Sequence, residues 1–297
     1  MVTQRAEHPD YRLDVHSMKS ERQSRNNTPD TYGETRKSGV TKPMAKITGR
    51  RVQLSLPRRW IADIMHLSRG MPCFVVDRRL NFAEVVAART TIPIPPSWPA
   101  IFVKAYALVA LRRPELRRSY QTFPWAHFYE ADVSVASVAV NREYEGEPAV
   151  FFGPLHAPDQ QSLAQLTGHL HDYKTKPVEE IRAFARLIKY TRYPKPIRRF
   201  LWWLGMNLTG KHRAKSIGTF GLSTLSSRQT GLLHVPSPCA TTLTYGPIAA
   251  DGTVEVRLSA DHRVLDGLAA ALALEELERV LGGEILRELQ NGPALPD

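Results

Sequence analysis

The sequence contains very little cysteine: Cys73 and Cys239 are the only two in 297 residues. Two cysteines that are far apart in the chain can build neither a disulfide framework nor a cysteine-rich zinc site, and a reducing cytoplasmic compartment is expected. Long apolar runs are also missing. No stretch of about 18 apolar residues occurs, and the N-terminus has no apolar segment of the signal-peptide kind, so neither a membrane-spanning helix nor an export signal is expected.

Acidic residues are missing from one segment. Between Ile181 and Lys215 there are ten Lys and Arg residues and no Asp or Glu, so this segment carries nearly all of the net charge of +11. The rest of the chain is close to neutral. A charge this localised indicates one basic surface, and no nucleic-acid-binding motif accompanies it, so nucleic acid is not expected as a partner.

The first part of the chain lacks a hydrophobic period. Residues 1 to about 46 are rich in Ser, Thr, Asn, Arg and Glu, a composition that buries too little apolar surface to offset the entropy of ordering. We predict a disordered tail over 1–46, within which Met44 is a candidate alternative start codon. One folded domain is predicted over 47–290.

Within that domain helical and strand patterns alternate irregularly. Apolar residues at helical spacing predict helices over 54–67, 82–88, 100–112, 162–173, 178–190 and 267–281. Strands are predicted over 73–76, 127–140, 147–152, 219–225, 239–246 and 253–259, with a hairpin turn at Glu145-Gly146. This order favours a two-layer α/β domain, a mixed sheet with helices packed on it.

One motif near the C-terminus carries residues suited to acid–base chemistry. It reads Asp261-His262-Arg263-Val264-Leu265-Asp266-Gly267 and joins a predicted strand to a predicted helix. A histidine at such a corner is a candidate general base, and a carboxylate four residues later can hold its loop. The plainer interpretation is a histidine with structural partners only, with Asp266 as a helix N-cap. The remaining histidines have no ligand-like arrangement with Cys or acidic residues, so no metal site is expected.

The same motif resembles the signature of the catalytic domain of dihydrolipoamide acyltransferases, which belong to 2-oxo acid dehydrogenase complexes and share a fold with chloramphenicol acetyltransferase. Three further segments are similar to that family's motifs in the family's order: 57–65 (PRRWIADIM), 132–136 (DVSVA) and 218–225 (GTFGLSTL). Four motifs in order are much harder to obtain by chance than one. The resemblance covers roughly residues 50–285.

The resemblance implies a function and roles for several residues. The chain would be an acyltransferase that moves an acyl group from coenzyme A or another thioester to a thiol, hydroxyl or amine, without a metal. His262 would be the general base, and Ser223 would donate a hydrogen bond to the oxyanion, although a strand serine bonded to backbone is an equal alternative. Asp266 would pair with Arg58 or Arg59 to hold the histidine loop, with Gly267 beside it. The family also implies a homotrimer in which the serine and the histidine come from different subunits.

Two segments depart from the family. Gly146 to Gly153 replaces the family's G-L-I-T-P, and no lipoyl domain precedes the first predicted helix, so a lipoyl substrate and membership of a dehydrogenase complex are not expected. Residues 183–215 look like an insertion that joins basic side chains to Phe200, Trp202 and Trp203. This insertion is interpreted in three ways: as a basic rim for the phosphates of coenzyme A, as a peripheral membrane contact, or as a solvated face packed onto the domain. The candidate coenzyme A-binding residues are Arg198, Arg199 and Lys211.

Two functions from other classes stay open at this stage. One is a non-catalytic trimeric scaffold of the same fold, and the other is a membrane-surface binding protein that uses the basic aromatic segment. A scaffold needs no general base, whereas His262, Asp266, Gly267 and Ser223 occur together in this chain.

Overall fold

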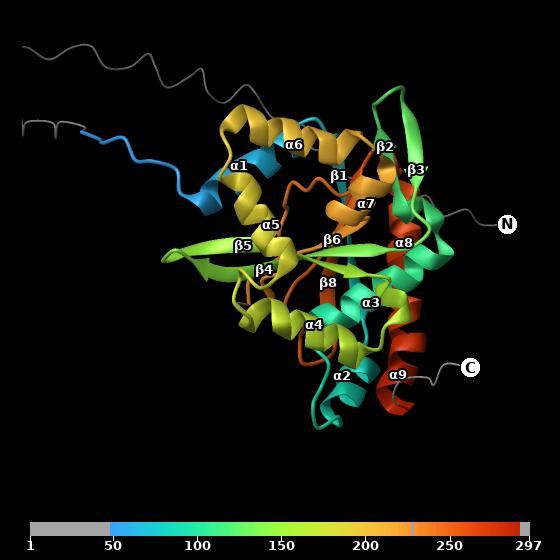
Figure 1. Ribbon diagram of the computed structural model, residues 1–297. Coiled ribbons are helices and arrows are strands. Elements are labelled where there is room, and N and C mark those ends of the chain that lie inside the picture. The colour runs from blue at the N-terminus through green and yellow to red at the C-terminus, as the bar shows by residue number, and fades with distance from the viewer. Residues whose placement is uncertain (1–47, 227–228, 292–297) are drawn as a thin grey trace, which may run out of the picture. The chain divides into compact units, whose positions relative to one another are not determined.

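The structure, a computed structural model, describes residues 48–226 and 229–291. Its central element is a mixed β-sheet (Figure 1). Six strands in these ranges lie in the order β1-β8-β7-β6-β4-β5. They are β1 (Cys73–Asn81), β4 (Val135–Tyr144), β5 (Glu147–His156), β6 (Phe220–Leu222), β7 (Thr241–Tyr245) and β8 (Thr253–Asp261). β6 is parallel to both of its neighbours, and the other pairs are antiparallel. The predicted α/β class with a mixed sheet is therefore confirmed.

Helices cover the sheet, and most of them begin and end close to the predicted positions. They are α1 (Leu56–Ser68), α2 (Ala83–Thr90), α3 (Trp98–Arg112), α4 (Leu163–Thr175), α5 (Arg182–Thr191), α6 (Lys195–Asn207), α7 (Gly210–Ser216), α8 (Gly267–Val280) and α9 (Leu286–Asn291). Short 3₁₀ turns span Pro114–Arg117 and Pro158–Gln160, and a π-helical turn (Leu281–Ile285) joins α8 to α9. Residues 52 onward form one compact unit. The predicted tail over 1–46, with Met44, lies outside the described residues.

Two predicted elements differ from the structure. The strand expected over 127–140 is two strands: β3 (His127–Glu130) pairs with β2 (Arg118–Gln121) in a separate ribbon, and the chain enters the main sheet only at β4. The side chain of Arg117 donates to the carbonyl of Asp132 and fixes the break between them. The helix expected from Val178 begins at Arg182. The hairpin at Glu145-Gly146 is confirmed, because both residues have a positive φ, as a two-residue type I′ turn requires.

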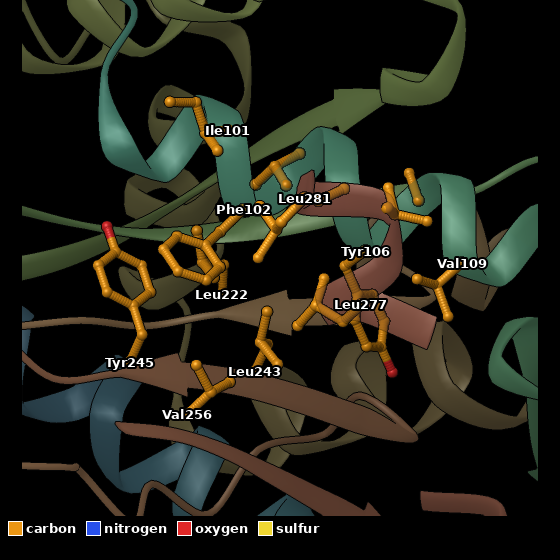
Figure 2. Close-up of a cluster of buried hydrophobic side chains, with 14 of the residues drawn as sticks. Ile101, Phe102, Tyr106, Val109, Leu222, Leu243, Tyr245, Val256, Leu277 and Leu281 are labelled. Carbon is orange, nitrogen blue, oxygen red and sulfur yellow. The ribbon is translucent and has the colours of Figure 1, made fainter. Parts of the chain in front are cut away.

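The hydrophobic core lies on one face of the sheet. Alternate residues of the strands, among them Leu222, Leu243 and Val256, meet the apolar residues of α3 and α8 (Figure 2). The ring of Phe102 on α3 stacks on that of Tyr245, with the ring centroids 4.0 Å apart. α3 is buried almost all round, as its unbroken apolar composition predicts.

The opposite face of the sheet carries small side chains at its centre, across β6, β7 and β8. Gly221, Thr242 and Ser259 pair in one row across β6, β7 and β8 and lie between the core-facing residues. A Cβ at Gly221 would lie 2.9 Å from Oγ1 of Thr242, so glycine permits the two strands to carry this row. α1, α6 and α7 lie on this side of the sheet, away from α2, α3 and α4 (Figure 1).

The segment 183–215 forms three helices, α5, α6 and α7. The guanidinium of Arg198 on α6 donates to both carboxylate oxygens of Asp63 on α1, at 2.6 and 3.3 Å. Both side chains are buried, with exposed fractions of 9% and 4%. The segment is therefore fixed to the first helix by a buried ion pair.

Candidate active site

His262 lies directly after β8, at the start of the turn that leads into α8. The backbone N–H groups of Val264 and Leu265 donate to the carbonyl of Asp261, and the N–H of His262 donates to the carbonyl of Pro72 at 2.8 Å. The imidazole packs on Phe74 of β1, with ring centroids 4.8 Å apart, and is otherwise exposed within one chain. The end of β8 and the ring of Phe74 thus position the imidazole, and its other side is open to a reactant or a second chain.

The carboxylate that braces this turn is Asp261. Its oxygens accept from Nε and Nη2 of Arg263, at 2.9 and 2.7 Å, and from the backbone N–H of Arg263. Asp261 is fully buried, and its hydrogen bond to Arg263 raises the pKa of the guanidinium. Arg263 in turn lies over the ring of Tyr120, 4.6 Å from its centroid. Sequence reasoning missed this pair, because Arg263 lies in the turn after β8 and no local pattern directs its side chain back to Asp261.

Asp266 has a different partner from the predicted one. Its side chain accepts from the backbone N–H of Ala269 at 2.8 Å and caps α8. Within the described ranges no ion pair joins Asp266 to Arg58 or Arg59, and Nε of Arg59 donates to the carbonyl of Leu54 instead. Within one chain the carboxylate of Asp266 thus serves as a local helix cap, and the predicted pairing is not seen. At Gly267 an added Cβ would meet no atom within 4 Å.

Ser223 follows the last residue of β6. Its backbone N–H donates to the carbonyl of Leu243 at 3.1 Å, so its position is set by the sheet. The residue is half-buried, and none of the residues that the structure describes is hydrogen-bonded to its hydroxyl. The hydroxyl is therefore free to donate to a ligand.

Ser223 and His262 lie at opposite ends of the sheet. Phe220, Thr241 and Ala260 form one row across three strands; Ser223 lies three residues past this row, and His262 lies two residues past it in the opposite direction. With about 3.3 Å per residue and about 4.8 Å between strands, the two residues are roughly 19 Å apart. Within one chain they cannot act on the same carbonyl group.

The three predicted coenzyme A-binding cations have different environments. Arg198 is buried with Asp63, so its predicted role in binding phosphate was wrong. Arg199 is half-buried, and Lys211 is exposed on α7. A further buried cation, Arg213, donates to the carbonyls of Tyr120 and Pro238, and its burial lowers the pKa of its guanidinium.

A pocket of about 570 Å³ lies between the sheet and the inserted helices. Its walls come from α1, α5, α6 and α7 on one side and from β4, β5 and β6 on the other, and Ser223 is part of the lining. A neighbouring pocket of about 500 Å³ shares Thr242 and Cys239 with it and includes Cys73 and Ser259. Neither pocket was predicted from the sequence, because residues far apart in the chain form the walls.

Two features are absent from the part of the chain that the structure describes. No group of three or more His, Cys, Asp or Glu residues is arranged to hold a metal ion there. Among the same residues no helix is both long and apolar enough to cross a membrane.

The fold is that of the catalytic cores of dihydrolipoamide acetyltransferases. A probable dihydrolipoamide acetyltransferase from Listeria monocytogenes matches with a TM-score of 0.57 and 17% identity, over 83% of this chain and 98% of that one. The dihydrolipoamide acetyltransferase of Azotobacter vinelandii, studied for the roles of a serine, a histidine and an asparagine in its mechanism, matches with a TM-score of 0.57 and 18% identity, over 89% and 99%. The cubic core of a pyruvate dehydrogenase complex matches with a TM-score of 0.55 and 17% identity, over 83% and 98%. No protein-family model and no curated protein sequence matches this chain.

Proposed function

We propose that this chain is an acyltransferase that moves an acyl group from coenzyme A, or from another thioester carrier, to a thiol, hydroxyl or amine acceptor. The observation that carries the proposal is the placement of two reactive groups on this fold: an open imidazole after β8 and an unpartnered hydroxyl after β6. The similar acetyltransferase from Azotobacter vinelandii, in which a serine and a histidine were studied for their roles in catalysis, supports it.

The two groups divide the reaction between them. His262 accepts the proton of the acceptor while the acceptor's heteroatom attacks the thioester carbonyl carbon, and the carbonyl electron pair moves to oxygen. The hydroxyl of Ser223 donates to that oxyanion, an interaction that typically contributes about 10²–10³-fold in rate. When the C–O double bond re-forms, the C–S bond breaks and the leaving thiolate takes the proton from His262.

A working site needs two chains. Since Ser223 and His262 of one chain are roughly 19 Å apart, the serine of one subunit must meet the histidine of the next. A closed ring of identical subunits repeats one such contact at every interface, and a homotrimer is the ring that we propose. The exposed side of His262 is the surface that the neighbour would cover.

Coenzyme A would be a substrate held by the basic rim of the inserted helices. Lys211 and Arg186 are exposed there, and Arg199 is half-buried, whereas Arg198 is committed to Asp63. Exposed cations attract the phosphates of coenzyme A as point charges, so we propose these three residues as the phosphate-binding groups.

The first experiment measures thiol release from a panel of acyl-coenzyme A donors. His262→Ala is expected to lower the rate by about 10²–10⁴-fold, because the proton acceptor is lost. His169→Ala is the matched control, since His169 is an exposed histidine on α4. Undiminished release by the His262 variant would contradict the mechanism. If no donor is turned over although the protein assembles, the non-catalytic scaffold is the better description.

An exposed aromatic surface favours one additional role, a peripheral membrane contact. Phe200 and Trp203 on α6 stack on each other and are 58% and 44% exposed, and Phe123 packs edge-on against Trp203. An exposed cation, Lys195, begins the same helix, and Arg192 is exposed just before it. Aromatic side chains beside cations suit the interface of an anionic membrane.

A further inference from the structure

The pocket beneath α5 and α6 is lined mainly by apolar side chains. Ile61 and Met65 of α1, Leu187 of α5, and Leu201 and Trp202 of α6 form its outer wall, and Phe152 and Val150 of β5 are part of its inner wall. A volume of about 570 Å³ is of the size that proteins use for small ligands, about 300–1,000 Å³. An apolar lining of this extent matches a hydrocarbon ligand rather than a charged one.

Polar residues also line this pocket, and two of their hydroxyls are important here. Ser223 lines it with a hydroxyl that no described residue engages, and Oγ1 of Thr242, a residue only 5% exposed, is buried without a hydrogen-bond partner. Arg186 and His212 also line the pocket but are exposed, so they mark its mouth. Both hydroxyls lack a partner among the described residues, the one of Thr242 in a buried position and the one of Ser223 in a half-buried position, and a bound carbonyl would give either of them an acceptor.

We infer that this pocket holds the aliphatic chain of the acyl group, so that the donor is a medium- or long-chain acyl thioester rather than an acetyl thioester. The inference rests on the proposed function, because it places the thioester carbonyl at Ser223. When the carbonyl is hydrogen-bonded to Ser223, the carbon chain attached to it extends into the pocket. An acetyl group would leave most of the pocket empty. The donor is thus selected by the inserted helices, which provide the outer wall.

Chain length is the direct test. Binding of non-transferable S-alkyl coenzyme A thioethers, from ethyl to dodecyl, is measured by titration calorimetry on the full-length oligomer. Affinity is expected to rise about fourfold for each added methylene until the pocket is full. Thiol release from the matching acyl thioesters should follow the same order in kcat/KM. Equal affinity for every chain length would overturn the inference.

A matched pair of variants locates the effect. Gly205 of α6 is buried and lines the pocket, and a Cβ added there meets no atom within 4 Å. Gly205→Leu should therefore fit the helix, fill part of the pocket and weaken dodecyl binding roughly 10–100-fold without changing ethyl binding. Gly168→Leu makes the same change on the exposed side of α4, where a Cβ also meets nothing, and should change neither.

The outcomes separate this inference from the proposed function. Chain-length-dependent binding that Gly205→Leu removes, in a protein that releases no thiol, supports the pocket and contradicts the acyltransferase. Thiol release with a preference for acetyl donors supports the acyltransferase and overturns the pocket. A change in oligomer size in Gly205→Leu, with chain-length dependence unaltered, would show that another copy of the chain fills the space and would also overturn it.

Discussion

The two carboxylates on either side of His262 have separate tasks. Asp261 is buried and holds Arg263, which shapes the turn, whereas Asp266 is exposed and caps α8. The motif predicted from sequence assigned the bracing role to Asp266. The structure assigns it to Asp261, because the side chain of Asp261 is buried and hydrogen-bonded to Arg263, whereas that of Asp266 is exposed and caps α8.

A cap and a brace respond differently to substitution. Asp266→Ala should destabilise the folded chain by about 0.5–2 kcal/mol, because the N–H of Ala269 loses its acceptor, and Asp266→Asn should retain most of that stability. Urea unfolding at equilibrium measures both. Arg58→Ala is the companion variant. If Arg58→Ala lowers stability in the wild-type chain but not in the Asp266→Ala chain, the two residues form the ion pair that was predicted from sequence.

The types of the reactive residues were accessible from sequence, and their partners were not. His262 and Ser223 were predicted from short motifs, and the structure places each at the end of a strand, as those motifs indicate. Their separation by about 19 Å follows only from the order and register of three strands. That order depends on the whole sheet, so no local pattern encodes it.

At the scale of elements, a buried ion pair joins α6 to α1. Arg198→Ala should cost about 3–5 kcal/mol, because Asp63 would remain buried without its partner. Lys195→Ala, on the exposed start of the same helix, should change stability little. The double variant Asp63→Leu, Arg198→Met should recover much of the loss. Urea unfolding of the wild-type chain and the three variants measures these differences. A small effect of Arg198→Ala would mean that the ion pair does not stabilise the position of α6.

The exposed side of α6 leads to a separate prediction. Binding to phosphatidylserine vesicles, measured by flotation, should fall roughly tenfold for each of Phe200→Ala and Trp203→Ala, because each aromatic side chain buries apolar surface in the interface. Leu268→Ala on α8 is the control, since Leu268 is 70% exposed on another element. Flotation that is absent, or that the aromatic variants leave unchanged, contradicts the membrane contact.

Most helices and core strands were predicted well, because their hydrophobic periods are local. The environments of the side chains in segment 183–215 were not predicted. Its charge indicated a basic rim that included Arg198, and the burial of Arg198 became visible only when α6 was placed against α1. Trp202 and Trp203 are adjacent in sequence, yet Trp202 lines the pocket and Trp203 is exposed. Composition shows that such residues are present, while helix packing decides which way each one faces.

At the scale of the whole molecule, two inactive variants should restore one another. Ser223→Ala chains keep His262, and His262→Ala chains keep Ser223, so an interface between one chain of each kind can contain both groups. After random mixing in equal amounts, about one quarter of the interfaces would be intact in a cyclic assembly. Thiol release near that fraction of the wild-type rate is expected after denaturation and refolding together. Activity that stays at the level of the separate variants would mean that the two residues do not meet across subunits.

The chemically different faces of the sheet have a consequence for how the protein can change. One face, with Leu243 and Val256, packs on the helices of the core, and the other, with Gly221 and Thr242, borders the pocket. Alternation keeps these tasks on different residues of the same strands. A substitution at Thr242 therefore changes the pocket without replacing a residue of this core, so the acyl-chain selectivity that we propose can change without a first loss of core packing.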